Sequence, residues 1–210
     1  MKQRTRLKRS TGGFTLLELL VVIIVIGVLF AIAAPGWDTI LSRQRVSAAR
    51  EQVVQTIRVA QSDARRSRSP RAVVFDMSTA SKPRIANVPY IPDNTQATAN
   101  RNTVLINNTS GAWVLLGNGN VNAGTLRLTV NGATTNAANT FPLLIFDGNG
   151  AIAQTPLVPA TQTIPSVITV SRGNNTGRAT DRCVVVATLL GAIRTEEGAF
   201  NAGTGKGCPL

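Results

Sequence analysis

The sequence predicts an α+β fold in which one long N-terminal helix packs on an antiparallel β-sheet. Three observations support this prediction. Residues 19–34 are apolar and carry no charge, residues 37–69 have an amphipathic pattern with helical spacing, and the chain beyond Pro70 has short apolar segments separated by clusters of Gly, Asn and Pro. With 210 residues and no second boundary in composition, we expect one domain beyond the helix.

The first part of the helix follows a basic leader. Five cations lie between residues 2 and 9, and Glu18 is the only ionisable side chain between Arg9 and Asp38. Residues 14–36 provide the roughly 20 residues that a spanning helix needs, and a basic leader stays on the cytoplasmic side of a membrane. An ordinary secretory signal has its small residues after the apolar core. Here Gly12 and Gly13 precede the core, so a cut after them would remove residues 1–13 and keep the helix.

The second part of the helix, residues 37–69, has an apolar stripe. Its members recur at three- and four-residue steps, as in a helix that packs on another element: Val46, Ala49, Val53, Ile57, Ala60 and Ala64. Arginines occupy other faces, at Arg43, Arg50, Arg58 and Arg65. This row is interpreted as a solvated or inter-subunit surface, with a nucleic-acid face as the alternative. Ser69-Pro70 ends the helix, which would run for roughly 80 Å from Phe14 to Arg68.

Residues 70–210 are predicted to form the β-rich domain. The expected strands are residues 71–77, 103–106, 113–116, 125–130, 143–146, 151–154, 166–171 and 182–189, with a weaker one at 192–194. Residues 143–151 contain the clearest hairpin, because the turn is rich in residues that tolerate positive φ. Residues 82–101 contain three prolines and many polar residues, and we expect a loop there.

The composition argues against an enzyme, a cofactor or a metal site. The chain has no histidine, which removes the commonest general base and the commonest metal ligand. Residues 202–207 lack the pattern of a phosphate loop, and residues 147–150 lack the acidic residue that would close a calcium loop. Cys183 and Cys208 follow an export signal, so we expect them to form a disulfide, which would be worth about 3.5 kcal/mol on the chain-entropy model.

The segment Gly13-Phe14-Thr15-Leu16-Leu17-Glu18 resembles the class III signal of type IV prepilins and type II secretion pseudopilins. The resemblance implies that prepilin peptidase cuts between Gly13 and Phe14, that Phe14 is N-methylated, and that Glu18 becomes the fifth mature residue. It also implies that Gly27 and Pro35 loosen the helix.

The position of Glu18 has a physical reason beside this resemblance. A carboxylate within the hydrocarbon region costs on the order of 2.5–3.5 kcal/mol, so it requires a compensating partner. Phe14 and Glu18 are four residues apart and lie on one helix face. The new amine at Phe14 could therefore pair with Glu18 of a neighbouring subunit. The alternative is a Glu18 side chain that reaches back to the membrane interface.

Most of the chain, above all residues 12–75, looks like the GspH/FimT family of minor pilins and pseudopilins. The prepilin stem, the early strand at residues 71–75 and the hairpin at residues 146–150 carry this resemblance. It implies a pilin-like fold and a subunit of a type II secretion pseudopilus or a type IV pilus. Its partners would be other pilins, prepilin peptidase and the inner-membrane assembly platform. The chain would cross the bacterial inner membrane once, with its C-terminal domain in the periplasm.

Some members of this family are DNA receptors, which is the alternative function. They use a C-terminal G-R-x-R motif, and residues 190–195 keep its glycine and its second arginine but have Ala192 in place of the first. Glu196 and Glu197 follow at once and would repel phosphate. Without the five leader cations, 17 basic residues face 10 acidic ones, so non-specific phosphate contact is feasible. The candidate DNA contacts are Arg172, Arg178, Arg182 and Arg194.

Overall fold

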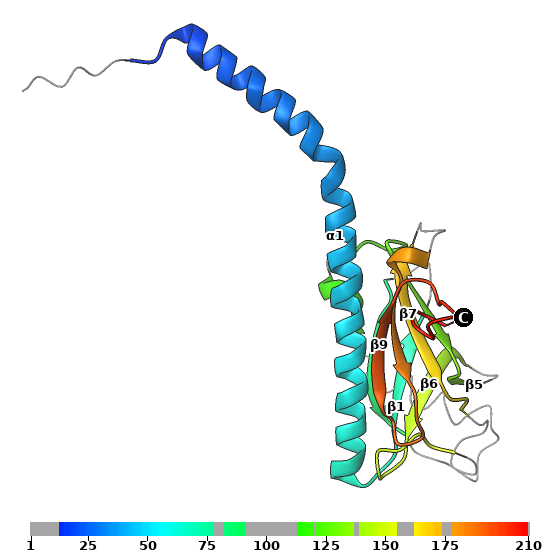
Figure 1. Ribbon diagram of the computed structural model, residues 1–210. Helices are drawn as coiled ribbons and strands as arrows, with labels where there is room; N and C mark the ends of the chain where they lie inside the picture. The colour runs from blue at the N-terminus through cyan, green and yellow to red at the C-terminus, as the bar shows by residue number, and fades with distance from the viewer. Residues whose placement is uncertain are drawn as a thin grey trace, which may run out of the picture. The chain divides into compact units, whose positions relative to one another are not determined.

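The computed structural model describes residues 13–77, 82–90, 113–119, 121–136, 139–154, 162–173 and 178–209. One helix, α1 (Leu16–Ser67), precedes nine strands in the described residues (Figure 1). The chain divides into two compact units, residues 1–41 and residues 42–210, which are described separately. The predicted leader and the predicted strand at residues 103–106 lie outside the described residues, except for Gly13.

The first unit contains the apolar part of α1. Its large apolar side chains from Leu16 to Ile32 are 48% to 85% exposed. Within the described residues, no helix is both long enough and apolar enough to cross a membrane. The helix is continuous through Gly27 and Pro35, and the helix-loosening role of these two residues stays a prediction.

The second unit is built on the amphipathic part of α1. The apolar stripe predicted from the sequence, from Val46 to Ala64, is at most 2% exposed. The helix ends where Arg68 adopts a left-handed conformation, with φ of 50°. The amide of Ser69 then donates to the carbonyl of Ala64, and the Ser67 hydroxyl donates to the carbonyl of Asp63. The first of these contacts satisfies a carbonyl group that the end of a helix leaves free.

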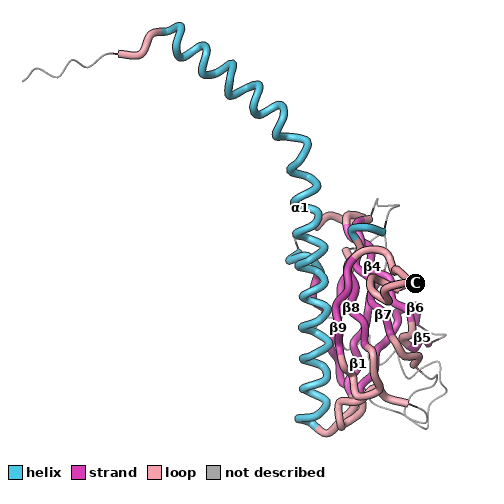
Figure 2. The backbone as a smooth tube through the Cα atoms, in the orientation of Figure 1, coloured by secondary structure: helices cyan, strands magenta, loops and turns pink. Residues whose placement is uncertain are grey.

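Two antiparallel sheets pack against this helix, in place of the single sheet that the sequence predicted (Figure 2). Sheet A has the order β3-β2-β1-β6-β5, with β1 (Arg71–Asp76), β2 (Arg84–Pro89), β3 (Trp113–Leu115), β5 (Thr134–Asn136) and β6 (Asn139–Phe146). Sheet B has the order β4-β7-β8-β9, with β4 (Leu126–Asn131), β7 (Ser166–Arg172), β8 (Arg182–Val186) and β9 (Ile193–Glu197). The prediction of an α+β fold with a long N-terminal helix is confirmed.

Strand β1 is buried on both faces because it lies in the centre of sheet A. Val73 and Phe75 point into the core that α1 shares with both sheets. Ala72 and Val74, which alternate with them, belong to a second apolar cluster on the opposite face. This explains why residues 71–76 form a nearly continuous apolar segment.

Sheet B also buries both faces, although less evenly. Ile168, Val170 and Val184 face the helix and join the shared core. Val167 and Val185 face away from it and pack with the two cysteines. The C-terminal segment, which contains Cys208, therefore covers part of the outer face of sheet B.

The loop predicted at residues 82–101 is wrong in its first part, because β2 occupies Arg84–Pro89. Ile85, Ala86 and Val88 of this strand are buried. Neighbours β1 and β3 supply its ladder, and Pro89 stands at the end of the strand, where its missing N–H costs least. The prolines suggested a loop because sequence alone does not reveal which residues a neighbouring strand will pair.

Other boundaries also differ from the sequence prediction. Residues 151–154 form only an isolated bridge, Phe146 to Ile152, and not a full strand. Strand β8 ends at Val186, because the amide of Ala187 donates to the carbonyl of Ala192 and closes the turn into β9. Strand β9 extends to Glu197, beyond the weak strand predicted at residues 192–194. Strand β5, which is three residues long, was not predicted.

The turn after β6 docks on α1. The Asp147 side chain accepts hydrogen bonds from the amides of Asn149 and Ala151, which holds the turn. Gln61 donates to the carbonyl of Gly150, at 2.9 Å, and Arg65 donates to that of Asn149, at 3.1 Å. Gln61 and Arg65 thus hold the turn at the end of sheet A against the helix.

Among the residues whose burial the structure describes, every buried apolar one lies between Val46 and Cys208. The second unit therefore contains a complete core and should fold without residues 1–36. Residues 37–210 contain the whole of this unit and suit stability and binding measurements.

Gly148→Ala should destabilise residues 37–210. A β-carbon at Gly148 would lie 2.8 Å from the carbonyl oxygen of Arg68, which belongs to the backbone and cannot turn aside. Overpacking of this kind typically costs about 1–3 kcal/mol. The free energy of unfolding in urea measures the effect.

Gly203→Ala provides the control, because its β-carbon would meet only the end of the Asn201 side chain, at 3.3 Å. We expect this variant to lose less than about 0.5 kcal/mol. Equal losses in the two variants would contradict the docking of the turn on the helix end.

Candidate functional site

The first functional feature is the start of α1. The amides of Glu18 and Leu19 donate to the carbonyl of Thr15, and the Glu18 amide also donates to the Thr15 hydroxyl, at 3.2 Å. Thr15 is therefore the N-cap of the helix, and Glu18 stands at the third helical position, as in a capping box. A carboxylate in the first turn also complements the helix dipole. The sequence analysis missed this local role, although the T-x-x-E spacing was its signal.

The Gly13–Phe14 bond precedes this cap. Gly13 is not in regular structure, and a β-carbon built on it would meet no atom within 4 Å. Phe14 is 83% exposed. The fold itself therefore places no demand on a glycine at position 13.

Comparison with known proteins points to the same segment. Residues 8–34 match the family model of the prokaryotic N-terminal methylation motif. This match includes Gly13, Phe14, Glu18 and Gly27. The chain therefore has a prepilin-like N-terminus, with a motif that implies membrane anchoring, processing by prepilin peptidase and assembly with pilins.

Comparison of the whole chain with curated proteins and solved structures shows less similarity. No curated protein matches this chain. Among solved structures, the type IV minor pilin FimU of Pseudomonas aeruginosa is similar, with 15% sequence identity and a TM-score of 0.44. The similarity covers 73% of this chain and 90% of that one.

Three of the four arginines predicted as DNA contacts belong to strands of sheet B and lie on two different faces of it, whereas Arg178 belongs to the short 3-10 helix before β8. Arg172, at the end of β7, is opposite Leu126, which faces α1. Arg182, at the start of β8, faces α1 as well, because it is opposite Val170. Arg194 is opposite Val185 and therefore points to the outer face. The structure does not bring the four together.

Arg178 is engaged within the fold. Its guanidinium donates to the carbonyls of Cys208, at 2.9 Å, and Pro209, at 3.3 Å. It also lies 3.5 Å from the carboxylate of Asp181. These contacts clamp the C-terminal segment beside the disulfide, so an Arg178 substitution would disturb this segment whatever the arginine binds.

The predicted disulfide, Cys183 to Cys208, is confirmed, and both cysteines are fully buried. The Cys208 amide donates to the carbonyl of Gly198. The amide of Gly207 donates to the Glu196 carboxylate, at 3.3 Å. The disulfide and these hydrogen bonds hold the glycine-rich end of the chain against sheet B.

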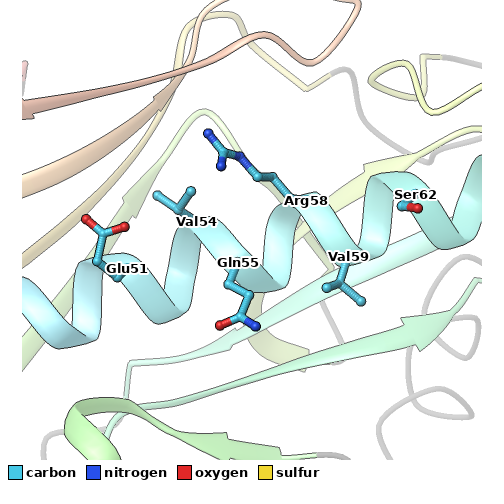
Figure 3. Close-up of a pocket in the computed structure, with 6 residues that line it drawn as sticks. All are labelled: Glu51, Val54, Gln55, Arg58, Val59 and Ser62. Atoms are coloured by element: carbon cyan, nitrogen blue, oxygen red, sulfur yellow. The ribbon is translucent and has the colours of Figure 1, made fainter.

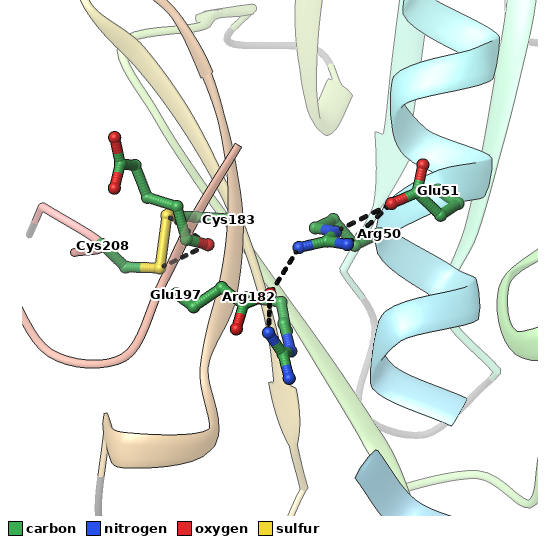
Figure 4. A network of polar contacts seen from close by, with 7 residues as sticks. Arg50, Glu51, Arg182, Cys183, Glu197 and Cys208 are labelled. Carbon is green, nitrogen blue, oxygen red and sulfur yellow. Dashed lines mark hydrogen bonds and ion pairs between the residues drawn. A yellow bond between two sulfur atoms is a disulfide. The ribbon is translucent and has the colours of Figure 1, made fainter. Parts of the chain in front are cut away.

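A chain of charges joins α1 to the edge strand β9 (Figure 4). The Glu197 carboxylate contacts Arg50, at 2.9 Å, and also Arg182, and both reach the same oxygen. Arg50 makes a second ion pair with Glu51, at 2.7 Å. Burial lowers the pKa of Arg182 from its usual value, and the nearby charges of Arg50 and Arg43 lower it further. Several cations are thus crowded at one end of the interface between α1 and sheet B.

The solvent face of α1 carries a groove (Figure 3). Its lining residues are Glu51, Val54, Gln55, Arg58, Val59 and Ser62. They offer no nucleophile with a base beside it. In the part of the chain that the structure describes, no group of three His, Cys, Asp or Glu residues could hold a metal ion.

Asp181 gives a prediction about pH. Burial raises the pKa of Asp181 above its ordinary value of 3.8, while its hydrogen bond and attraction to Arg178 act in the opposite direction. The folded state thus binds this proton more tightly than the unfolded state does. As the pH rises above 3.8 through the folded-state pKa, ionisation of Asp181 lowers the free energy of unfolding.

Asp181→Asn removes this titration. The free energy of unfolding of the variant, relative to that of the unmodified chain, should therefore rise with pH in the window just above 3.8 and then level off. Urea unfolding of residues 37–210 at a series of pH values measures this difference. A relative stability that falls with rising pH would mean that Arg178 outweighs burial.

Proposed function

We propose that the chain is a minor pilin or pseudopilin of the GspH/FimT type. It would serve in initiating or assembling a type II secretion pseudopilus or a type IV pilus. The observation that carries this proposal is the methylation motif at residues 8–34, which coincides with the start of a helix whose apolar side chains are exposed.

The apolar part of α1 needs a partner. Exposed apolar surfaces of this size mark contacts with a membrane or with other proteins. In the proposed function, residues 14–36 are first held in the inner membrane and later surrounded by the stems of neighbouring subunits. No described helix qualifies as a membrane span, so the membrane stage rests on the motif and on the exposure of the apolar side chains.

Residues 42–210 support the proposal as a second part of the same subunit. Their core is closed by sheets A and B and by the disulfide, independently of the apolar part of α1. This arrangement suits a subunit that displays a folded unit outside the membrane while its stem changes surroundings. The unit would then lie in the periplasm, where a disulfide is stable.

The DNA-receptor alternative draws less support from the arginines. Arg178 holds the C-terminal segment, and Arg194 lies 3.9 Å from the Glu196 carboxylate. Arg172 and Arg182 face the opposite side of the sheet. A DNA backbone that runs along one face would meet two of these four residues at most.

Processing provides the first test. In a host with prepilin peptidase, mass spectrometry of the purified protein should show a chain that begins with N-methylated Phe14. Gly13→Val should prevent the cut, because it places a branched side chain at the bond to be cleaved. The fold has open space at Gly13, so the variant should unfold at the same temperature as the unmodified chain.

Gly27→Ala is the matched control, since a β-carbon there also meets no atom within 4 Å. This variant should be cut normally. An intact leader on the unmodified chain in such a host, or a cut beyond Ala34, would contradict the proposed function.

Assembly provides the second test. Glu18→Gln removes the charge but keeps a residue that suits the third position of a capping box. It should be cleaved and methylated normally, yet its incorporation into filaments should fall sharply, because loss of one member of a buried ion pair costs about 3–5 kcal/mol. The fraction of the subunit in purified filaments measures this effect.

Glu51→Gln is the control, because Glu51 is a largely exposed carboxylate on the same helix. If Glu18→Gln and the unmodified chain enter filaments equally, Glu18 acts only as a helix-capping residue, and its proposed role in pairing with Phe14 is wrong.

A further inference from the structure

Four arginines from three elements gather at one end of the second unit. We call Arg43, Arg50, Arg172 and Arg182 the basic patch. Arg43 and Arg50 are two helical turns apart on one flank of α1. Arg182 shares an ion-paired carboxylate with Arg50, and Arg43 acts electrostatically on Arg182. Arg172 lies two residues beyond Val170, the partner of Arg182, on the same face of sheet B.

The basic patch has more positive than negative charge. Among the described residues, the carboxylates that contact it are Glu197, which Arg50 and Arg182 share, and Glu51, which pairs with Arg50. Asp181 and Glu196 neighbour the patch in sequence, but their contacts are with Arg178 and Arg194. Arg50 and Arg182 are mostly buried, with side chains 15% and 23% exposed. They are committed to holding β9 against the helix.

Arg43 and Arg172 remain available to bind an anion. Both are exposed, and neither makes an ion pair with any residue in the described ranges. Glu51 and Glu197 balance the charges of Arg50 and Arg182, so the excess positive charge of the patch is that of Arg43 and Arg172, which an anion at the patch would meet. Guanidinium groups bind phosphate oxygens through two parallel hydrogen bonds. The chemistry of the patch therefore suits phosphate.

The place of Arg43 in the chain indicates which phosphate is near. Eight residues separate Arg43 in the sequence from Ala34, the last residue of the apolar run. An arginine at this distance from a membrane-held segment lies within reach of the lipid headgroups.

We propose that the basic patch binds the phosphate groups of anionic phospholipids at the membrane surface. The inference rests on the proposed function, because it requires the apolar run to be held in a membrane. The contact would orient the folded unit against the membrane before the subunit enters a filament. Lipid suits the patch better than DNA does, since Arg178 and Arg194, which would be needed to extend a DNA track, are turned to the other face and engaged there.

Vesicle binding of residues 37–210 tests this proposal without the apolar run. The unmodified unit should sediment with vesicles of equimolar phosphatidylglycerol and phosphatidylcholine, and not with vesicles of phosphatidylcholine alone. Binding should weaken as salt is added. The double variant Arg43→Gln, Arg172→Gln should bind the anionic vesicles about 25-fold more weakly, since each basic residue near such a surface contributes about a fivefold effect.

The matched control is the double variant Arg66→Gln, Arg194→Gln. It removes the same net charge from two exposed arginines outside the patch. This variant should bind the anionic vesicles nearly as well as the unmodified unit. Thermal unfolding of both double variants checks the fold, and we expect no change for Arg43 and Arg172, which have no partner to lose among the described residues.

Three outcomes would overturn the proposal. The first is equal binding to both kinds of vesicle or to neither, and the second is equal weakening by the two double variants. The third is binding to duplex DNA, at the same salt, that is tighter than binding to anionic vesicles and depends on Arg43 and Arg172. That result would assign the patch to DNA. Because the processing and assembly tests use the full chain and a different readout, failure of this proposal is distinguishable from failure of the proposed function.

Discussion

Burial of one narrow helix stripe holds the second unit together. Half of the stripe consists of alanines, Ala49, Ala60 and Ala64, and the stripe packs with apolar side chains of both sheets in one continuous cluster. Small residues let the strands approach the helix closely. A cavity in this stripe would be felt by both sheets at once, since interiors are packed too densely to absorb a change in one layer alone.

Polar contacts beside the stripe determine how each sheet meets the helix. On the side of sheet A, the Asn87 amide donates to Asp63, and the Gly117 amide donates to Gln52. On the side of sheet B, Arg50 reaches Glu197. Apolar burial has little directional preference, whereas these hydrogen bonds and ion pairs have defined geometry. The helix therefore uses its apolar stripe for stability and its two polar flanks for position.

Most charged residues of α1 lie in the part of the helix that packs in the second unit. Residues 19–34 carry no charge, and the arginines begin after them. Some of these arginines are used inside the unit, as Arg50 and Arg65 are, and others are left exposed, as Arg43 and Arg58 are. An arginine's position in the sequence does not distinguish these two groups, because the distinction depends on which carboxylate or carbonyl the fold brings near.

The sequence by itself determined the features that depend on neighbours in the chain. The prepilin-like motif, the apolar run and the periodic stripe from Val46 to Ala64 are local patterns, and helical hydrogen bonds are local as well, so the helix could be predicted to within two residues. The pairing of Cys183 with Cys208 followed because the chain has no other cysteine.

Only the tertiary structure decided which strands pair and which polar groups meet. Strand β2 was missed because the three prolines of residues 82–101 outweigh the apolar residues of the strand in the sequence, while β1 and β3 supply its hydrogen bonds from distant positions. The separation of Arg172 and Arg182 from Arg194 depends on the register of β7, β8 and β9, since a shift of one residue moves a side chain to the opposite face. Register arises from the packing of whole sheets on the helix, and no local stretch of sequence contains it.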